Sequence, residues 1–144
     1  FNIFKVIYLS GNEPFLSSPS VDYLKDIKEG DEVALNSKKF LFADYFNTIK
    51  RGIAYHWNPG GVVMLNDPRG NIYGIKERYT KLSIILDKSG SIIKIEPVVS
   101  CGVDVLDAEA VNAVKSAAPF PNPPEQLIEN GTFKIEFGFL LTRQ

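Results

Sequence analysis

Few side chains in this sequence are of the types that carry catalytic chemistry. His56 is the only histidine and Cys101 the only cysteine. A histidine can act as a general base or ligate a metal, and a thiol at a helix start can be activated as a nucleophile. However, no serine lies in a G-x-S-x-G sequence, and no second cysteine can complete a disulfide or a multi-cysteine metal site. We predict structural roles for both residues, with no catalytic, cofactor-binding or metal-binding residue, and a small Cys/His enzyme as the less favoured alternative.

Three carboxylates, those of Asp104, Asp107 and Glu109, are close enough in sequence to work as general acid and base. The interpretation we favour is that they start a helix, with Asp104 as the N-cap and Asp107 in a capping-box-like spacing. Residues 87–90, DKSG, resemble only the start of a calcium loop and predict a hairpin turn. Residues 130–132 match a glycosylation sequon, but Asn-Gly before a strand favours a turn.

Two stretches have the apolar spacing of amphipathic helices. The first covers residues 42–57 and should end at Asn58-Pro59, because the residue before proline disfavours helical backbone. Its apolar face is formed by Phe42, Phe46, Ile49, Ile53 and Trp57. The second covers residues 105–118. Its apolar face is formed by Leu106, Ala110, Val114 and Ala117. Between them, residues 62–65 (VVML) are expected to be a short strand or an extended piece.

Alternating apolar residues predict three strands in the second half of the chain. Residues 79–86 and 91–100 form a hairpin, with Pro97 indicating an edge or a bulge in its return strand. The final strand, around TFKIEFGFLL, alternates most regularly. Two helices that each bury one face then imply an α+β domain of two layers. We predict a small, mostly antiparallel three-stranded sheet packed against two helices, with the final strand beside the first hairpin strand.

The chain of 144 residues is long enough for one domain with an arm. We assign residues 1–41 to an N-terminal arm or lead-in segment and residues 42–144 to the domain. The net charge of −1 and the lack of a basic stripe argue against nucleic acid as a partner. No run approaches the ~20 apolar residues of a membrane span. Because the sequence begins with Phe1, we expect a fragment, and a signal or anchor upstream stays open.

Four prolines fall within the six residues 119–124 of the stretch AAPFPNPPEQL, residues 117–127. Such a run can be a polyproline ligand, a flexible linker or a stiff crossover. It follows a predicted helix and precedes the most regular strand. Pro119 therefore stops the helix, and the later prolines keep the chain extended, which lowers the entropy lost when the last strand is placed. We favour the stiff crossover.

The second half of the chain resembles a known family. The series SCGVDVLDAEAVNAVKSAAPFPNPPEQL followed by FKIEFGF is similar to the C-terminal domain of the TonB/TolA energy-transducer family, as is YFNTIKRGIAYHWNP at residues 45–59. The resemblance covers about residues 42–144. It implies a periplasmic domain, without cofactors, that binds an outer-membrane or periplasmic protein. A missing N-terminal region would engage a proton-driven motor in the inner membrane.

The resemblance also implies binding by β-strand addition, in which backbone hydrogen bonds to a sheet edge hold a partner strand. The residues assigned to this docking edge are Thr132, Phe133, Lys134, Ile135, Glu136, Phe137, Gly138, Phe139, Leu140 and Leu141. A TolA-like adaptor, or one for motility or secretion, is the alternative on the same fold. Residues 1–9 are apolar and prone to form a strand. We expect them to pair with an exposed edge, within the chain or in a swapped homodimer, and so to cover the docking strand.

Overall fold

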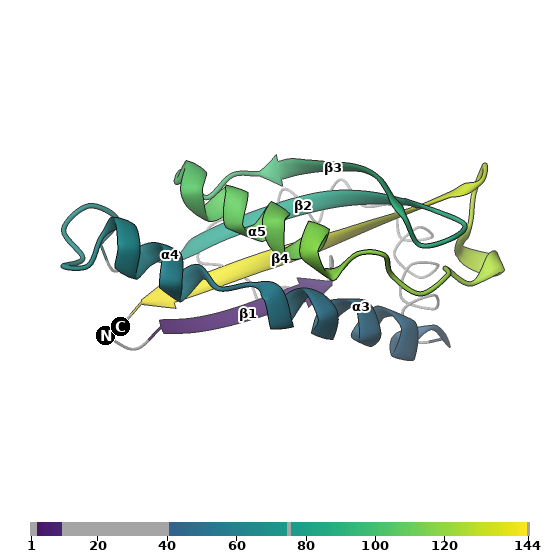
Figure 1. Cartoon of the computed structure of the whole chain (residues 1–144), viewed down its shortest axis with the longest axis horizontal. Coiled ribbons are helices and arrows are strands. Elements are labelled where there is room, and N and C mark those ends of the chain that lie inside the picture. The colour runs from purple at the N-terminus through teal and green to yellow at the C-terminus, as the bar shows by residue number, and fades with distance from the viewer. Residues whose placement is uncertain (1–2, 10–40, 75, 144) are drawn as a thin grey trace, which may run out of the picture.

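The structure, a computed structural model, describes residues 3–9, 41–74 and 76–143. Its sheet has four strands in the order β1 (Ile3–Leu9), β4 (Thr132–Arg143), β2 (Arg78–Asp87) and β3 (Ile92–Val99), and all neighbouring pairs are antiparallel (Figure 1). The final strand lies beside the first hairpin strand, as predicted. The predicted count of three strands is wrong, because the N-terminal segment adds β1 to the sheet.

In the described ranges, three helices lie on one face of the sheet: α3 (Ala43–His56), α4 (Pro59–Asn66) and α5 (Asp104–Ala117) (Figure 1). A short 3-10 helix, η1 (Glu125–Leu127), precedes β4. The predicted α+β fold of two layers is therefore confirmed. The domain boundary at residue 41 stays a prediction, since residues 10–40 lie outside the described ranges.

The helix α4 replaces the short strand or extended piece expected at residues 62–65. The side chain of Asn58 accepts a hydrogen bond from the backbone N–H of Gly61 at 3.1 Å, and Pro59 occupies the first helical position. Asparagine is a preferred N-cap, and proline is favoured at this position because its missing N–H would have no helical partner there. The Asn58-Pro59 pair therefore ends one helix and begins the next.

The core lies between the sheet and the helices. From α3 it receives the apolar face predicted from the sequence, and from β4 the alternating aromatic residues. Its fully or almost fully buried members include Ile49, Ile53, Trp57, Leu82, Ile84, Leu86, Ala110, Val114, Ile135, Phe137 and Phe139. The rings of Trp57 and Phe139 meet edge to face, with centroids 5.2 Å apart. This contact joins the end of α3 to the centre of the sheet.

The proline-rich segment is packed onto the hairpin turn between β2 and β3. The carboxylate of Asp87 accepts hydrogen bonds from the backbone N–H groups of Ser89 and Ser91, which confirms the predicted turn. The backbone N–H of Phe120 donates to the carbonyl of Gly90 at 3.0 Å, and Phe120 itself is buried. The hydroxyl of Tyr45 donates to the carbonyl of Pro121. These contacts hold the segment at both the turn and α3, as a stiff crossover requires.

Candidate functional site

The predicted docking strand β4 is not a sheet edge along its whole length. On one side it pairs with β2 from Thr132 to Leu141. On the other side β1 pairs with it from Phe137, opposite Leu9, to Arg143, opposite Ile3. The predicted edge is therefore corrected over Phe137–Leu141, where β1 covers it within the chain. The N-terminal strand does cover the docking strand, as expected, but only over this half.

The outer side of β4 extends beyond the end of β1. In the part of the chain that the structure describes, no strand pairs with this side over Thr132–Glu136. Thr132 and Glu129 exchange two backbone hydrogen bonds, so the N–H and C=O of Thr132 point away from β2. Because these groups alternate in direction along an antiparallel strand, those of Lys134 and Glu136 also point outward. Among the described residues, no strand bonds to these groups of Lys134 and Glu136.

A hollow of about 130 Å³ lies next to this uncovered stretch, at the end of β1. It is lined by Tyr8, Leu9, Ala43, Phe46, Asn47, Lys50 and Phe137. Phe46 and Phe137 belong to the buried core, whereas Lys50 is partly exposed. The hollow is therefore lined by both apolar and polar side chains, with the cation of Lys50 among them. It lies on the face of the sheet that the helices cover, because α3 supplies most of its lining residues.

The strand β1 is held in place by contacts at its centre. Ile7 is buried against the core, whereas Phe4 and Val6 are exposed. The ammonium group of Lys5 donates to the backbone carbonyl of Trp57 and lies 5.9 Å from the centroid of its ring. A cation is favoured at such a helix C-terminus by the helix dipole and over an indole ring by the π-electrons. Through these two contacts, Lys5 stabilises the packing of β1 against the end of α3.

The opposite edge of the sheet, β3, is poorly suited to strand addition. Pro97 has no N–H to donate, and the pairing with β2 shifts register at two places. The side chains of Lys94 and Glu96 form an exposed ion pair at 3.3 Å. Proline, bulges and charges are the features by which natural sheets prevent pairing at an edge. Of the two sides, the outer side of β4 is therefore better suited to bind an extended segment.

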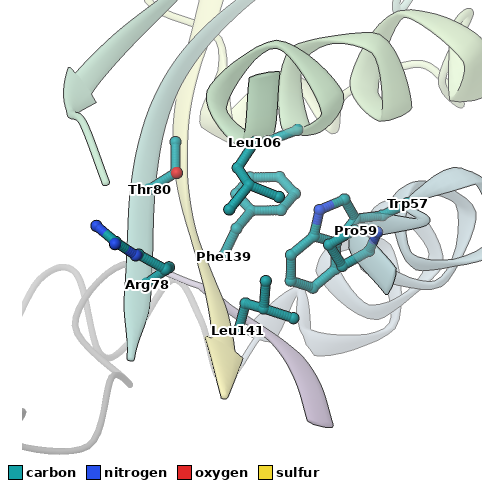
Figure 2. A pocket seen from close by; sticks show the side chains of 8 residues that line it. Trp57, Pro59, Arg78, Thr80, Leu106, Phe139 and Leu141 are labelled. Carbon is teal, nitrogen blue, oxygen red and sulfur yellow. The ribbon is translucent and has the colours of Figure 1, made fainter. Parts of the chain in front are cut away.

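The space below the junction of α3 and α4 is closely filled (Figure 2). Trp57, Pro59 and Leu106 surround a cavity of about 10 Å³, which is room for a single water molecule at most. The guanidinium of Arg78 points away from these apolar side chains in Figure 2, and it donates to the backbone carbonyls of Cys101 and Tyr73. This region is packing rather than a binding pocket.

The capping interpretation of the aspartates is wrong in detail. The N-cap of α5 is Val103, and Asp104 is the first helical residue. Asp107 instead accepts hydrogen bonds from the Thr80 hydroxyl at 2.6 Å, from the Ser100 hydroxyl and from the backbone N–H of Cys101. The carboxylate therefore joins the start of α5 to β2 and to the segment between β3 and α5.

Asp107→Ala is expected to lower the free energy of unfolding by about 1–2 kcal/mol at pH 7, because three donors lose their acceptor. Partial burial acts to raise the pKa of Asp107, but the hydrogen bonds from Ser100, Thr80 and Cys101 hold it below its ordinary value of 3.8. The stabilisation is therefore complete above about pH 5 and is lost as the pH falls through the lowered pKa.

Urea titrations of the unchanged protein and of Asp107→Ala from pH 7 down to pH 3 would measure this effect. The difference in the free energy of unfolding between the two proteins should become smaller toward pH 3. Asp104→Ala is the matched control, because Asp104 is exposed and lies in the same helical turn. A difference for Asp107→Ala that did not change with pH would show that its charge has no part in the stabilisation.

Neither candidate nucleophile or base has the surroundings of a catalytic group. Burial, and to a lesser degree the charge of Asp107, raises the pKa of the Cys101 thiol above its ordinary value of 9.0. The thiol is therefore protonated at neutral pH, and it donates to the carbonyl of Val103. His56 is exposed in the last turn of α3, edge-on to Tyr55. Across the described ranges, no three His, Cys, Asp or Glu side chains gather as metal ligands would.

The fold and this arrangement define a small α+β domain of two layers with a partly covered central strand. A family model described as TonB C terminal matches residues 42–137, which is more than half of the chain, and the chain belongs to this family. The resemblance predicted from the sequence is thereby confirmed. A comparison with curated proteins gives no significant match.

A solved structure has a similar fold. It is the NMR solution structure of the TonB C-terminal domain of Helicobacter pylori, with a TM-score of 0.52. The two chains are 20% identical, and the similarity covers 92% of this chain and 98% of that one. At this identity the likeness supports the fold alone. Among the helices that the structure describes, none is both long and apolar enough to cross a membrane.

Proposed function

We propose that this chain is a non-enzymatic periplasmic domain of a TonB-like energy transducer. It binds an outer-membrane or periplasmic protein by β-strand addition. Further residues of a longer protein couple it to a proton-driven motor in the inner membrane. Membership of the TonB C-terminal family supports this class of function. The observation that carries the mode of binding is the outer side of β4 at Lys134 and Glu136, with which no strand of the described residues pairs.

Backbone geometry explains why this side is suitable. Two successive outward-pointing residues, Lys134 and Glu136, offer two N–H donors and two carbonyl acceptors in the spacing of a strand. The other side of β4 is paired with β2 from Thr132 to Leu141, so the acceptor strand is already held in the sheet. A partner strand thus gains hydrogen bonds without requiring the sheet to reorganise. The edge of β3 offers no such continuous row because of Pro97 and its bulges.

Site-specific crosslinking in the full-length protein tests the proposal. A photo-crosslinking residue at position 134 should form adducts with an outer-membrane protein in intact cells. The same residue at Lys88, in the exposed turn between β2 and β3, is the control and should give far fewer. Equal adducts from both positions, or none with any envelope protein, would contradict strand addition at β4.

A second measurement uses the backbone itself. Glu136→Pro removes one outward N–H while leaving the ladder to β2 intact in principle, and partner binding should weaken by about tenfold or more. Circular dichroism would establish that the variant is folded. Because the proposed function is not enzymatic, Cys101→Ser and His56→Ala should leave partner binding unchanged. A folded Glu136→Pro variant with full affinity would be inconsistent with the proposed mode.

A further inference from the structure

The sheet has α3, α4 and α5 on one face, and its other face, which we call the second face, carries several buried side chains (Figure 1). We propose that residues 10–40, which lie outside the described ranges, pack on the second face over β2 and β4. They contact it through Leu24, Ile27 and neighbouring apolar side chains. The sheet then has a layer on each face, and this segment is part of the domain rather than an arm. The proposal concerns the chain's own residues and does not depend on the proposed function.

The alternation of side chains along each strand determines which residues point to the second face. In β2, Lys81 and Ser83 flank the core residue Leu82, so both point away from the helices. In β4, Leu140 follows the core residue Phe139 and points the same way. These side chains therefore lie on the second face, on the two inner strands of the sheet.

The three side chains are more buried than we expect on an open sheet surface. Lys81 and Leu140 are each 7% exposed, and Ser83 is 3% exposed. A lysine on an open surface keeps its charged end in water, and lysine is almost never fully buried without a partner. Phe4 and Val6 lie on the same face in the outermost strand β1, but they are 51% and 41% exposed. The burial is therefore concentrated on β2 and β4, over which no helix or strand of the described residues lies on this face.

Tyr79 makes part of the second face apolar. It lies opposite Leu140 in the pairing of β2 with β4. Its ring lies over Gly138, because a Cβ added to Gly138 would be 2.6 Å from a ring carbon of Tyr79. The tyrosine ring and the leucine side chain thus form one apolar surface, which is stabilised when other apolar side chains remove it from water.

The positions of the two ends of the segment also favour this face. Leu9 and Ala43 both line the hollow at the end of β1, so the chain between them starts and returns beside the sheet. About 30 residues that return to their start reach at most about 50 Å away, at ~3.3 Å per residue. Strands at a spacing of about 4.8 Å make a four-stranded sheet only about 15 Å wide. The segment is therefore long enough to cross the sheet and come back.

The sequence of the segment fits the apolar part of this surface. Val21, Leu24 and Ile27 recur at every third position, with charged residues between them. A recurrence close to the helical period gathers apolar side chains on one side of a segment. The side formed by these three residues is suited to cover Leu140 and Tyr79, while the charged side stays in water.

The charge of the segment complements that of the second face. The carboxylate of Glu136 is shared by two ammonium groups, at 3.6 Å from Lys81 and 3.7 Å from Lys134. Residues 10–40 contain more carboxylates than lysines. The carboxylates are those of Glu13, Asp22, Asp26, Glu29, Asp31 and Glu32, and the lysines are Lys25, Lys28, Lys38 and Lys39. A segment of net negative charge is therefore attracted to these two lysines.

Nuclear Overhauser effects between methyl groups of the whole chain test the proposal directly. Cross-peaks should join the methyl groups of Leu24 or Ile27 to those of Leu140. Leu65 is 84% exposed on α4, which lies on the other face of the sheet, and its methyl groups should give no cross-peak to the segment. A spectrum in which no residue of the segment contacts Leu140 would overturn the proposal.

Thiol labelling measures how well the segment covers the sheet. In a Cys101→Ser background, Ser83→Cys places a single thiol on the second face with little change in volume. Its reaction with a maleimide should be at least about tenfold slower than that of Lys88→Cys in the exposed turn, because it requires local opening. Adding Leu24→Ser and Ile27→Ser should make the reaction at position 83 at least about tenfold faster, because their apolar contacts are lost.

Two comparisons make this result specific. Lys25→Ser and Lys28→Ser change the same segment at charged positions and should leave the reaction at position 83 slow. Val114→Cys places a thiol in the core between the sheet and α5, where Val114 is fully buried. This thiol should stay unreactive when Leu24 and Ile27 are replaced, which would show that the segment has left the sheet while the core remains folded.

Three labelling results would contradict the proposal. Rapid reaction of Ser83→Cys in the otherwise unchanged Cys101→Ser chain would mean that the second face is open to a partner. A reaction that becomes faster on dilution would mean that a second copy of the chain covers this face. An unchanged rate after replacement of Leu24 and Ile27 would mean that neighbours within the sheet bury Ser83. None of these results concerns strand addition at β4, so the proposed function would still hold.

Discussion

Replacing Gly90 with alanine is expected to destabilise the domain by roughly 2–5 kcal/mol, combining left-handed backbone strain with overpacking. Gly90 has a φ of +82°, and an added Cβ would lie 1.9 Å from the backbone carbonyl oxygen of Phe120. That oxygen belongs to the stiff crossover and cannot move aside alone, because the N–H of Phe120 is bonded to the carbonyl of Gly90. Urea unfolding followed by circular dichroism would measure the change.

Gly131→Ala is the control that separates the two causes. Gly131 also has a positive φ, +79°, but nothing lies within 4 Å of its added Cβ. This variant should therefore be destabilised only by the strain of an alanine in the left-handed conformation, about 1–2 kcal/mol. Equal losses for the two variants would mean that the contact between the hairpin turn and the crossover contributes nothing to stability.

Trp57→Ala is the second substitution with a large expected effect, about 3–5 kcal/mol, which is typical of a buried aromatic residue cut back to alanine. The Trp57 side chain is only 3% exposed and packs against Phe139. It also lies under the ammonium group of Lys5, so its loss should loosen β1 as well as the core. Thermal unfolding would report the first effect, and faster amide exchange in β1 the second.

Tyr55 provides the comparison for Trp57. It lies two residues earlier in the same helix end and is a large aromatic residue, but it is 85% exposed. Tyr55→Ala should therefore change the free energy of unfolding by no more than about 0.5 kcal/mol. If Trp57→Ala unfolded the domain completely, Trp57→Phe would keep most of the buried area and should recover most of the stability. Similar losses for Tyr55→Ala and Trp57→Ala would contradict the packing assigned to Trp57.

Much of the fold could be predicted from the sequence because its elements have clear periodicity. The helical spacing from Phe42 to Trp57 corresponds to α3, and the alternation from Phe133 to Leu141 corresponds to β4. These patterns record which face of each element is buried, which is local information. The turn residues 87–90 likewise act within a few positions of one another.

Other features depend on information that a local pattern does not contain. The sequence Asn58-Pro59 contains both a helix end and a helix start, and only the first was predicted. The run VVML is too short for its period to distinguish a strand from a helix. The hydrogen bonds of Asp107 reach Thr80 on another element, so no spacing along the chain indicates them.

The candidate site was predicted in part. The outward direction of Lys134 and Glu136 agrees with the alternation in the sequence, but the extent of the free edge depends on β1. Its register with β4 joins residues as distant as Ile3 and Arg143. The hollow at the end of β1 combines residues of three elements, β1, α3 and β4. Charge and spacing along the chain could not reveal this group.

The antiparallel pairing of β1 with β4 also makes the domain's mechanical resistance depend on direction. The Ile3 end of β1 lies beside the Arg143 end of β4, where both ends of the described chain meet (Figure 1). Tension applied to that end of β1 along the strand axis acts in shear, so all the hydrogen bonds between the two strands bear load at once. Tension applied across the strands would instead break these hydrogen bonds one after another. The same hydrogen bonds therefore resist a force along the strand axis strongly and a force across the strands weakly.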